Sequence, residues 1–193
     1  MFYAVAVEFG EEWAGDPIFG YDIALLKLNR DASFTTPRLA HEDARPSVGD
    51  FLGGLGWGAT ASGESVTRLQ YVSSLRAITH EMCNEQWARL VDKETMVCAG
   101  IGPSDACRGM VNLLPILENA FSRCSGDSGG PLLQADSPDA DYKDGKPELD
   151  LIYGIISFGD GVCGNGTRAG VYTYIGYFQK WILSVIEVRF LNL

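Results

Sequence analysis

Short runs of β-branched and aromatic residues, bounded by Gly, Asp, Ser and Pro, recur along the chain. Such runs are typical of short strands separated by tight turns. Glycine is abundant, at 23 of 193 residues, which also favours many turns over long helices. Strands are predicted at Ile23–Leu28, Phe51–Trp57, Leu69–Ile78, Met96–Ala99, Pro131–Gln134, Leu149–Phe158 and Gly170–Tyr174. The pattern therefore predicts an all-β sandwich or barrel.

The period of the apolar positions changes near the C-terminus. From Tyr177 onward they recur at i, i+3, i+4, i+7 and i+8, a spacing that places them on one face of a helix. These positions are Phe178, Trp181, Ile182, Val185 and Ile186. We expect a terminal helix that docks on the β core.

Composition and charge narrow the class of protein. Hydrophobic residues make up 46% of the chain and charged residues 21%, which excludes intrinsic disorder. Acidic residues outnumber basic ones by 25 to 15, so neither nucleic acid nor an anionic membrane surface is an expected partner. No apolar run is long enough to span a membrane. Glu8, Glu11 and Glu12 interrupt the N-terminal apolar residues, so this segment does not resemble a signal peptide.

Two polar segments lie between the predicted strands. The stretch from Arg38 to Asp50 contains Pro46 and is typical of a connector between two subdomains. The acidic stretch Ala135–Leu149 lacks the order of ligands and glycine of a calcium loop, and is predicted to be a solvated hairpin loop. We therefore expect no metal and no other cofactor.

The chain has five cysteines and none of them forms a CxxC pair. In a secreted protein this number predicts two disulfides and one spare thiol, and in a cytosolic protein five free thiols. Composition leaves both possibilities open. The cysteines are Cys83, Cys98, Cys107, Cys124 and Cys163.

The residues Gly126–Pro131, with the sequence GDSGGP, carry the clearest chemistry. A serine hydroxyl becomes a nucleophile when a turn exposes it and a base takes its proton. Flanking glycines allow such a turn and leave amide N–H groups available to a developing oxyanion. A shorter Gly/Ser/Asp match would indicate only a surface loop.

This motif resembles the nucleophile motif of the trypsin-like serine proteases, and further segments match that family in the same order. They are Tyr21–Leu26, Gly56–Gly58, Ser157–Gly159 with Phe158 in place of the usual Trp, Gly170–Thr173, and the helix around Trp181. The resemblance implies a chymotrypsin-like double Greek-key β-barrel with an incomplete first barrel and a C-terminal helix. Residues 1–45 would be the remnant of the first barrel, and residues 46–193 the second barrel and the helix.

The resemblance also implies roles for individual residues. Ser128 would be the nucleophile, Asp22 the carboxylate that orients the base, and the amides of Gly126 and Ser128 the oxyanion hole. Asp127 would form an ion pair with the new N-terminus made by zymogen cleavage.

The family pattern pairs Cys83 with Cys98, and Cys107 with Cys163 across the substrate pocket. A further family bridge would use positions that here are Leu52 and Gln134, so both of its halves are missing together. Cys124 is left without a family partner.

The chain departs from the family in its catalytic base. The family histidine lies well upstream of the aspartate, but no His or Cys precedes Asp22. The histidines, His41 and His80, follow it and are expected to be ordinary surface or partly buried residues. Without a triad member, only a residual ~10³–10⁴-fold advantage over water is expected, so this chain should be nearly inert.

The second departure is the segment 109–125. The family places the pocket aspartate close before the serine, whereas Asp105 lies 23 positions before Ser128. Removing residues 109–125 restores the family spacing and an even number of cysteines, which suggests a retained intron. If the segment is genuine, Cys124 would replace Cys107 in the pocket bridge and Ser122 would take the specificity position.

Asp105 at the base of a pocket lined by Ser157, Gly159 and Gly170 would select Lys or Arg side chains of a protein or peptide substrate. With Ser122 in that position, the preference would shift to aromatic or apolar side chains. Asn165 fits a glycosylation sequon, and the alternative is an unmodified turn.

We therefore expect a secreted serine endopeptidase, made as a zymogen, whose partners are such substrates and protease inhibitors. Its signal peptide, propeptide and histidine would be encoded upstream of this chain. The alternatives are a protease-like secreted binding protein without catalysis and a pseudogene product.

Overall fold

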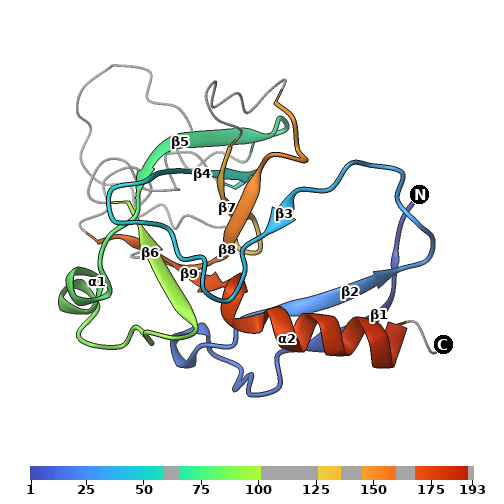
Figure 1. Cartoon of the computed structure of the whole chain (residues 1–193), viewed down its shortest axis with the longest axis horizontal. Helices are drawn as coiled ribbons and strands as arrows, with labels where there is room; N and C mark the ends of the chain where they lie inside the picture. The colour runs from blue at the N-terminus through green and yellow to red at the C-terminus, as the bar shows by residue number, and fades with distance from the viewer. Residues whose placement is uncertain (59–65, 101–125, 136–144, 160–167, 191–193) are drawn as a thin grey trace.

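The computed structural model describes residues 1–58, 66–100, 126–135, 145–159 and 168–190. Figure 1 shows two sheets and a C-terminal helix, α2 (Ile175–Val185), that runs beside the smaller sheet. The smaller sheet pairs β1 (Ala4–Phe9) with β2 (Ala24–Leu28) in antiparallel fashion. The larger one has the order β5-β4-β7-β8-β9-β6, and β3 pairs in parallel with β8.

Six of the seven strands of the larger sheet agree closely with predicted ones, and β3 is the exception. They are β3 (Arg38–Leu39), β4 (Phe51–Gly56), β5 (Gln70–Arg76), β6 (Met96–Ala99), β7 (Pro131–Gln134), β8 (Leu151–Phe158) and β9 (Gly170–Tyr174). This sheet curls into a half-barrel, which confirms the prediction of a mostly β, chymotrypsin-like architecture. Its inner residues form one core cluster, in which Leu52, Leu75, Leu132, Tyr172 and Tyr174 are almost fully buried.

Four short elements before the C-terminal helix were not among the predicted ones, and one of them is the 3-10 helix η1 (Pro17–Phe19). In the strand β1, exposed and half-buried positions alternate, but Val5, Val7 and Phe9 are the exposed ones and Glu8 is half-buried, so the sequence lacks the apolar and polar alternation that predicts a strand. The strand β3 has only two residues. The helix α1 (His80–Gln86) is too short to show a helical period, and it depends on its cap, because the Thr79 hydroxyl accepts from the amide of Met82 at 3.1 Å.

The predicted C-terminal helix is α2 (Ile175–Val185), and its apolar face is buried as expected. Phe178 and Ile182 pack with Ile23 of the N-terminal part of the chain. Ile186, predicted on the same buried face, is instead 37% exposed. That prediction is wrong because the α-helical period ends at Val185 and a π-helical turn, η3 (Ile186–Phe190), follows.

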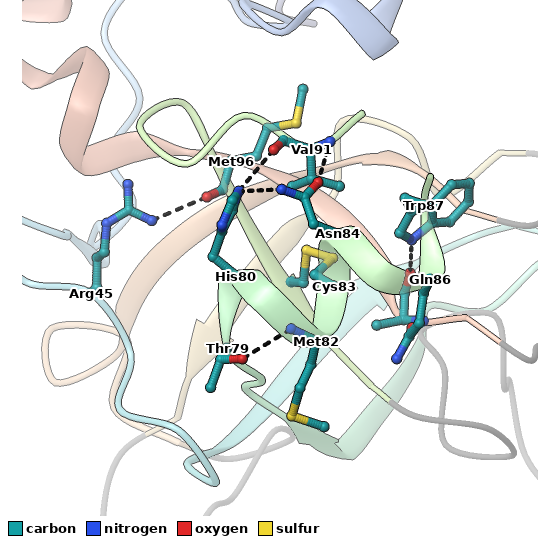
Figure 2. Close-up of a disulfide and its surroundings, with 12 residues drawn as sticks. Arg45, Thr79, His80, Met82, Cys83, Asn84, Gln86, Trp87, Val91 and Met96 are labelled. Atoms are coloured by element: carbon teal, nitrogen blue, oxygen red, sulfur yellow. Dashed lines mark hydrogen bonds between the residues drawn. A yellow bond between two sulfur atoms is a disulfide. The ribbon is translucent and has the colours of Figure 1, made fainter. Parts of the chain in front are cut away.

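A disulfide joins Cys83 of α1 to Cys98 of β6, the pair that the family resemblance implies. Figure 2 shows it beneath a set of polar contacts. The buried indole of Trp87 lies near it and donates through Nε1 to the carbonyl of Ala169 at 2.9 Å. The cross-link and this hydrogen bond fasten a short, otherwise weak helix to the sheet.

None of the helices within the described residues is long and apolar enough to cross a membrane. The proposed division of the chain at residue 45 stays a prediction.

Candidate active site

Asp22 lies two residues before β2, at a turn in the backbone. Its neighbour Tyr21 has a φ of 58°, and the amide of Ile23 donates back to the Tyr21 carbonyl at 2.8 Å. The hydroxyl of Ser157, on β8, donates to Asp22 Oδ2 at 2.6 Å, and the hydroxyl of Thr173, on β9, donates to the Asp22 main-chain carbonyl at 2.8 Å. Two strands of the larger sheet thus hold both the side chain and the backbone of this half-buried aspartate.

Ser128 lies in the tight turn that leads into β7. The turn closes through a hydrogen bond from the amide of Gly130 to the carbonyl of Asp127, 2.9 Å long. Gly129 has a φ of 85°, a conformation that glycine adopts without steric cost. Its amide donates to the Ile156 carbonyl at 2.9 Å, and the Ile156 amide donates to the Gly130 carbonyl at 2.8 Å. The strand β8 therefore fixes a turn whose serine side chain is exposed.

Asp22 and Ser128 line the same cavity, which has a volume of about 430 Å³. Its other walls are mainly apolar, from Phe9, Trp13, Ile23, Ala24, Leu26, Ile155 and Ile156. The turn at Ser128 and the turn at Asp22 meet here because both are fastened to β8. A carboxylate and a hydroxyl facing one space can hold a base between them, or bind a small molecule that carries one.

Asp127 points away from Ser128 toward the strand β4. Its Oδ1 accepts from the amide of Gly58 at 2.6 Å, and the carboxylate occupies the space that a Cβ at Gly56 or Gly58 would need. Glycine at both positions is thus explained by the close approach of this side chain. The expected ion pair of Asp127 with a new N-terminus stays a prediction.

Neither histidine lines the cavity between Asp22 and Ser128. His80, on α1, has its Nε2 2.8 Å from the carbonyl of Val91 and 2.9 Å from Asn84 Nδ2, as Figure 2 shows. The exposed residue His41 follows β3, and its main-chain carbonyl accepts from the Tyr174 hydroxyl at 2.9 Å. Both side chains are therefore placed as ordinary surface or partly buried residues.

Several other predicted site residues can be compared with their positions. No atom of the described residues lies within 4 Å of the place that a Cβ at Gly159 would take, and Gly170 begins β9. Among the hydrogen bonds between described residues, none is donated by the amide of Ser128, and its expected role with the amide of Gly126 in an oxyanion hole stays a prediction. The residues Asp105, Cys107, Ser122, Cys124, Cys163 and Asn165, and the whole segment 109–125, lie outside the described residues.

Reasoning from sequence missed Thr173 as a support of Asp22. Its signal was present, since Thr173 belongs to a segment that matches the family, but only the folded chain brings its hydroxyl to the Asp22 carbonyl. No pattern in the sequence predicted that Phe9 and Trp13 would form a wall of this cavity. In the part of the chain that is described, no group of His, Cys, Asp and Glu side chains is arranged to bind a metal.

A curled β half-barrel that brings a serine in a Gly-Asp-Ser-Gly-Gly-Pro turn and a carboxylate to one cavity is the arrangement of a serine protease. The family model described as Trypsin matches residues 4–109 and 116–182. This chain therefore belongs to the trypsin family of serine proteases.

The relatives with similar sequences include proteases of several vipers. The chain is 29% identical over 168 residues to the thrombin-like enzyme cerastocytin of Cerastes cerastes, covering 86% of this chain and 54% of that protein. It is 28% identical over 174 residues to the bradykinin-releasing enzyme KR-E-1 of Gloydius ussuriensis, covering 89% and 62%. It is 27% identical over 168 residues to the chymotrypsin-like protease VLCTLP of Macrovipera lebetinus, covering 86% and 54%. The chain thus spans little more than half the length of these relatives.

Proposed function

We propose that this chain carries the nucleophile and the orienting carboxylate of a secreted, trypsin-like endopeptidase that cleaves proteins after Lys or Arg. The observation that supports this most is the shared cavity of Asp22 and Ser128, with Ser157 bonded to the carboxylate. In this proposal Ser128 attacks the scissile carbonyl, and the amides of Gly126 and Ser128 stabilise the oxyanion. Asp105 pairs with the basic side chain of the substrate.

The chain by itself has low activity in this proposal, because neither His41 nor His80 borders the cavity and no other histidine is present. Triad chemistry without its base falls to the residual level of about 10³–10⁴-fold over water. In this proposal the complete protease carries the base upstream of Asp22, and the segment 109–125 is a retained intron that its spliced transcript lacks. The disulfide Cys83–Cys98 and the names of the relatives, one of them a snake venom serine protease of Bitis rhinoceros, favour secretion.

The experiment is an acylation assay with an activated aryl ester of N-blocked arginine, with and without added imidazole as an external base. Intact-mass measurement after rapid acid quench detects the acyl group. We expect imidazole-dependent acylation of the parent chain and none of Ser128→Ala. The matched glutamate ester should react far less, and Asp105→Asn should remove that difference.

Equal reaction of the parent and Ser128→Ala would overturn the assignment of the nucleophile. It would favour the second candidate, a secreted binding protein that keeps the protease scaffold without catalysis. Equal reaction of the arginine and glutamate esters would overturn the assignment of Asp105. The Ser122 alternative predicts instead that an aromatic ester is preferred.

A further inference from the structure

A second cavity, of about 760 Å³, lies beside the start of α2 and shares no lining residue with the cavity of Asp22 and Ser128. Its walls come from the turn after β1, the segment between β3 and β4, the residues before β6 and the first turns of α2. Figure 1 shows these segments near the end of α2 where β9 leads into the helix. Tyr21 lines this cavity, whereas its neighbour Asp22 lines the other one.

One wall of the second cavity is aromatic. Tyr21 contacts Tyr177 and Phe178 edge to face, with ring centroids 6.2 and 5.6 Å apart. Trp181 extends the wall, since its ring lies 6.4 Å from that of Phe178. The hydroxyls of Tyr21 and Tyr177 are 3.4 Å apart, and this contact raises the pKa of Tyr21 above its ordinary value. The faces of such rings attract cations.

The rest of the lining is mostly charged, and acidic side chains outnumber basic ones. It contains the carboxylates of Glu11, Glu12, Glu42, Asp43 and Glu94, against the basic side chains of Arg45, Lys93 and Lys180. Two of these three basic groups are already engaged. Lys180 forms an ion pair with Glu42 at 2.7 Å, and Arg45 donates to the carbonyls of Met96 and Glu94 at 3.1 and 2.6 Å. Among the described residues, Glu11, Glu12 and Asp43 have no ion-pair partner.

Arg45 also shows the chemistry that this lining supports. Its guanidinium carbon lies 4.1 Å from the centroid of the Tyr174 ring, which itself lines the cavity. A second guanidinium or ammonium group entering the cavity would meet an aromatic wall of the same kind and carboxylates that lack a cation. An anionic ligand would face like charges, and an apolar ligand would desolvate the carboxylates without compensation.

We propose that this cavity binds Lys or Arg side chains of a basic segment in a protein partner. The aromatic wall takes the cationic head and aliphatic stem, and Glu11, Glu12 and Asp43 supply the charge that pairs with the head. The site is separate from the pocket that Asp105 is expected to form, and its occupancy does not require catalysis.

The test is calorimetric titration of the chain, in a Ser128→Ala background that prevents cleavage, with acetyl-tetra-arginine amide at low and moderate salt. Acetyl-tetra-glutamate amide is the control peptide. The test variant is Glu11→Gln/Glu12→Gln/Asp43→Asn. The matched control variant is Asp31→Asn/Glu85→Gln/Glu148→Gln, which removes the same charge at exposed positions outside the cavity.

We expect the test variant to bind tetra-arginine at least about 10-fold more weakly, because three charge-assisted contacts are lost. The control variant should stay within about 2-fold of the parent, and binding should weaken with salt. Tyr177→Leu should bind tetra-arginine about 2- to 5-fold more weakly, because it removes one ring of the aromatic wall. Asp105→Asn should leave this binding unchanged, which separates the site from the expected specificity pocket.

If tetra-arginine binding weakens equally in the test and control variants, the proposal is overturned, because the overall negative charge of the chain then explains the binding. Absence of tetra-arginine binding by the parent chain would overturn it as well. Loss of binding in Asp105→Asn alone would assign the peptide to the specificity pocket instead.

Discussion

The disulfide between Cys83 and Cys98 gives the most quantitative prediction. Its removal is best tested with Cys83→Ala/Cys98→Ala, since both residues are buried, with exposed fractions of 0% and 5%. The bridge closes a loop with a sequence separation of 15 residues, and loop-closure entropy in the unfolded chain is then worth about 3 kcal/mol. The two lost sulfurs leave a small cavity that adds about 1 kcal/mol. Together these losses lower Tm by about 6–16 °C.

The assay is urea unfolding followed by tryptophan fluorescence, in which Trp87 reports on the disulfide region. We expect the free energy of unfolding to fall by about 3–4 kcal/mol and the m-value to rise, because the unfolded chain becomes more expanded without the cross-link. Val91→Ala is the matched control, since it removes volume from the same buried cluster and leaves the cross-link intact. It should lower stability without raising m. A double variant within about 0.5 kcal/mol of the parent, with an unchanged m-value, would refute the entropic reasoning.

Two further predictions concern single side chains. Trp87→Ala should lower the free energy of unfolding in urea by about 3–5 kcal/mol, because it empties a buried site and leaves the Ala169 carbonyl without its indole donor. A decrease below about 1 kcal/mol would contradict this prediction. Tyr21→Phe should remove a late-ionising tyrosine from a near-ultraviolet absorbance titration, because the contact with Tyr177 raises the pKa of Tyr21. A raised pKa means that the neutral phenol is stabilised by folding. Its contribution is therefore complete below the ordinary tyrosine pKa of about 10 and is lost as pH rises further. Tyr21→Phe should accordingly lose less stability than the parent at alkaline pH, and parallel curves would contradict the assignment.

The local pattern of apolar and polar residues was sufficient to predict most strands of the larger sheet and the helix α2. Alternation and β-branched runs depend on neighbouring residues, so Met96–Ala99, Pro131–Gln134 and Gly170–Tyr174 were predicted with their observed bounds. The same reasoning failed where tertiary contacts replace a local pattern. The helix α1 depends on a disulfide and a cap, and β1 is defined by its pairing with β2.

The nucleophile motif was sufficient to predict the turn at Ser128, because glycines adopt the left-handed backbone conformations that such a turn requires, as the positive φ of Gly126 and Gly129 shows. The support of Asp22 by Ser157 and Thr173 could not be inferred from spacing, since β8 and β9 lie far along the chain from β2. The position of the Asp127 carboxylate against Gly56 and Gly58 could not be inferred from spacing either. Such contacts depend on which strands become neighbours in the sheet.

By itself, the sequence determined the β class, the C-terminal helix, the serine turn and the family, because each of these is written in residues close together in the chain or in motifs that keep a fixed order. Only the tertiary structure decided that Asp22 and Ser128 border one cavity. It also decided that acidic and aromatic residues from separate segments gather around Tyr21 in another. Both follow from long-range packing, in which the burial of apolar faces selects the neighbours of each element and so brings together side chains that no local pattern relates.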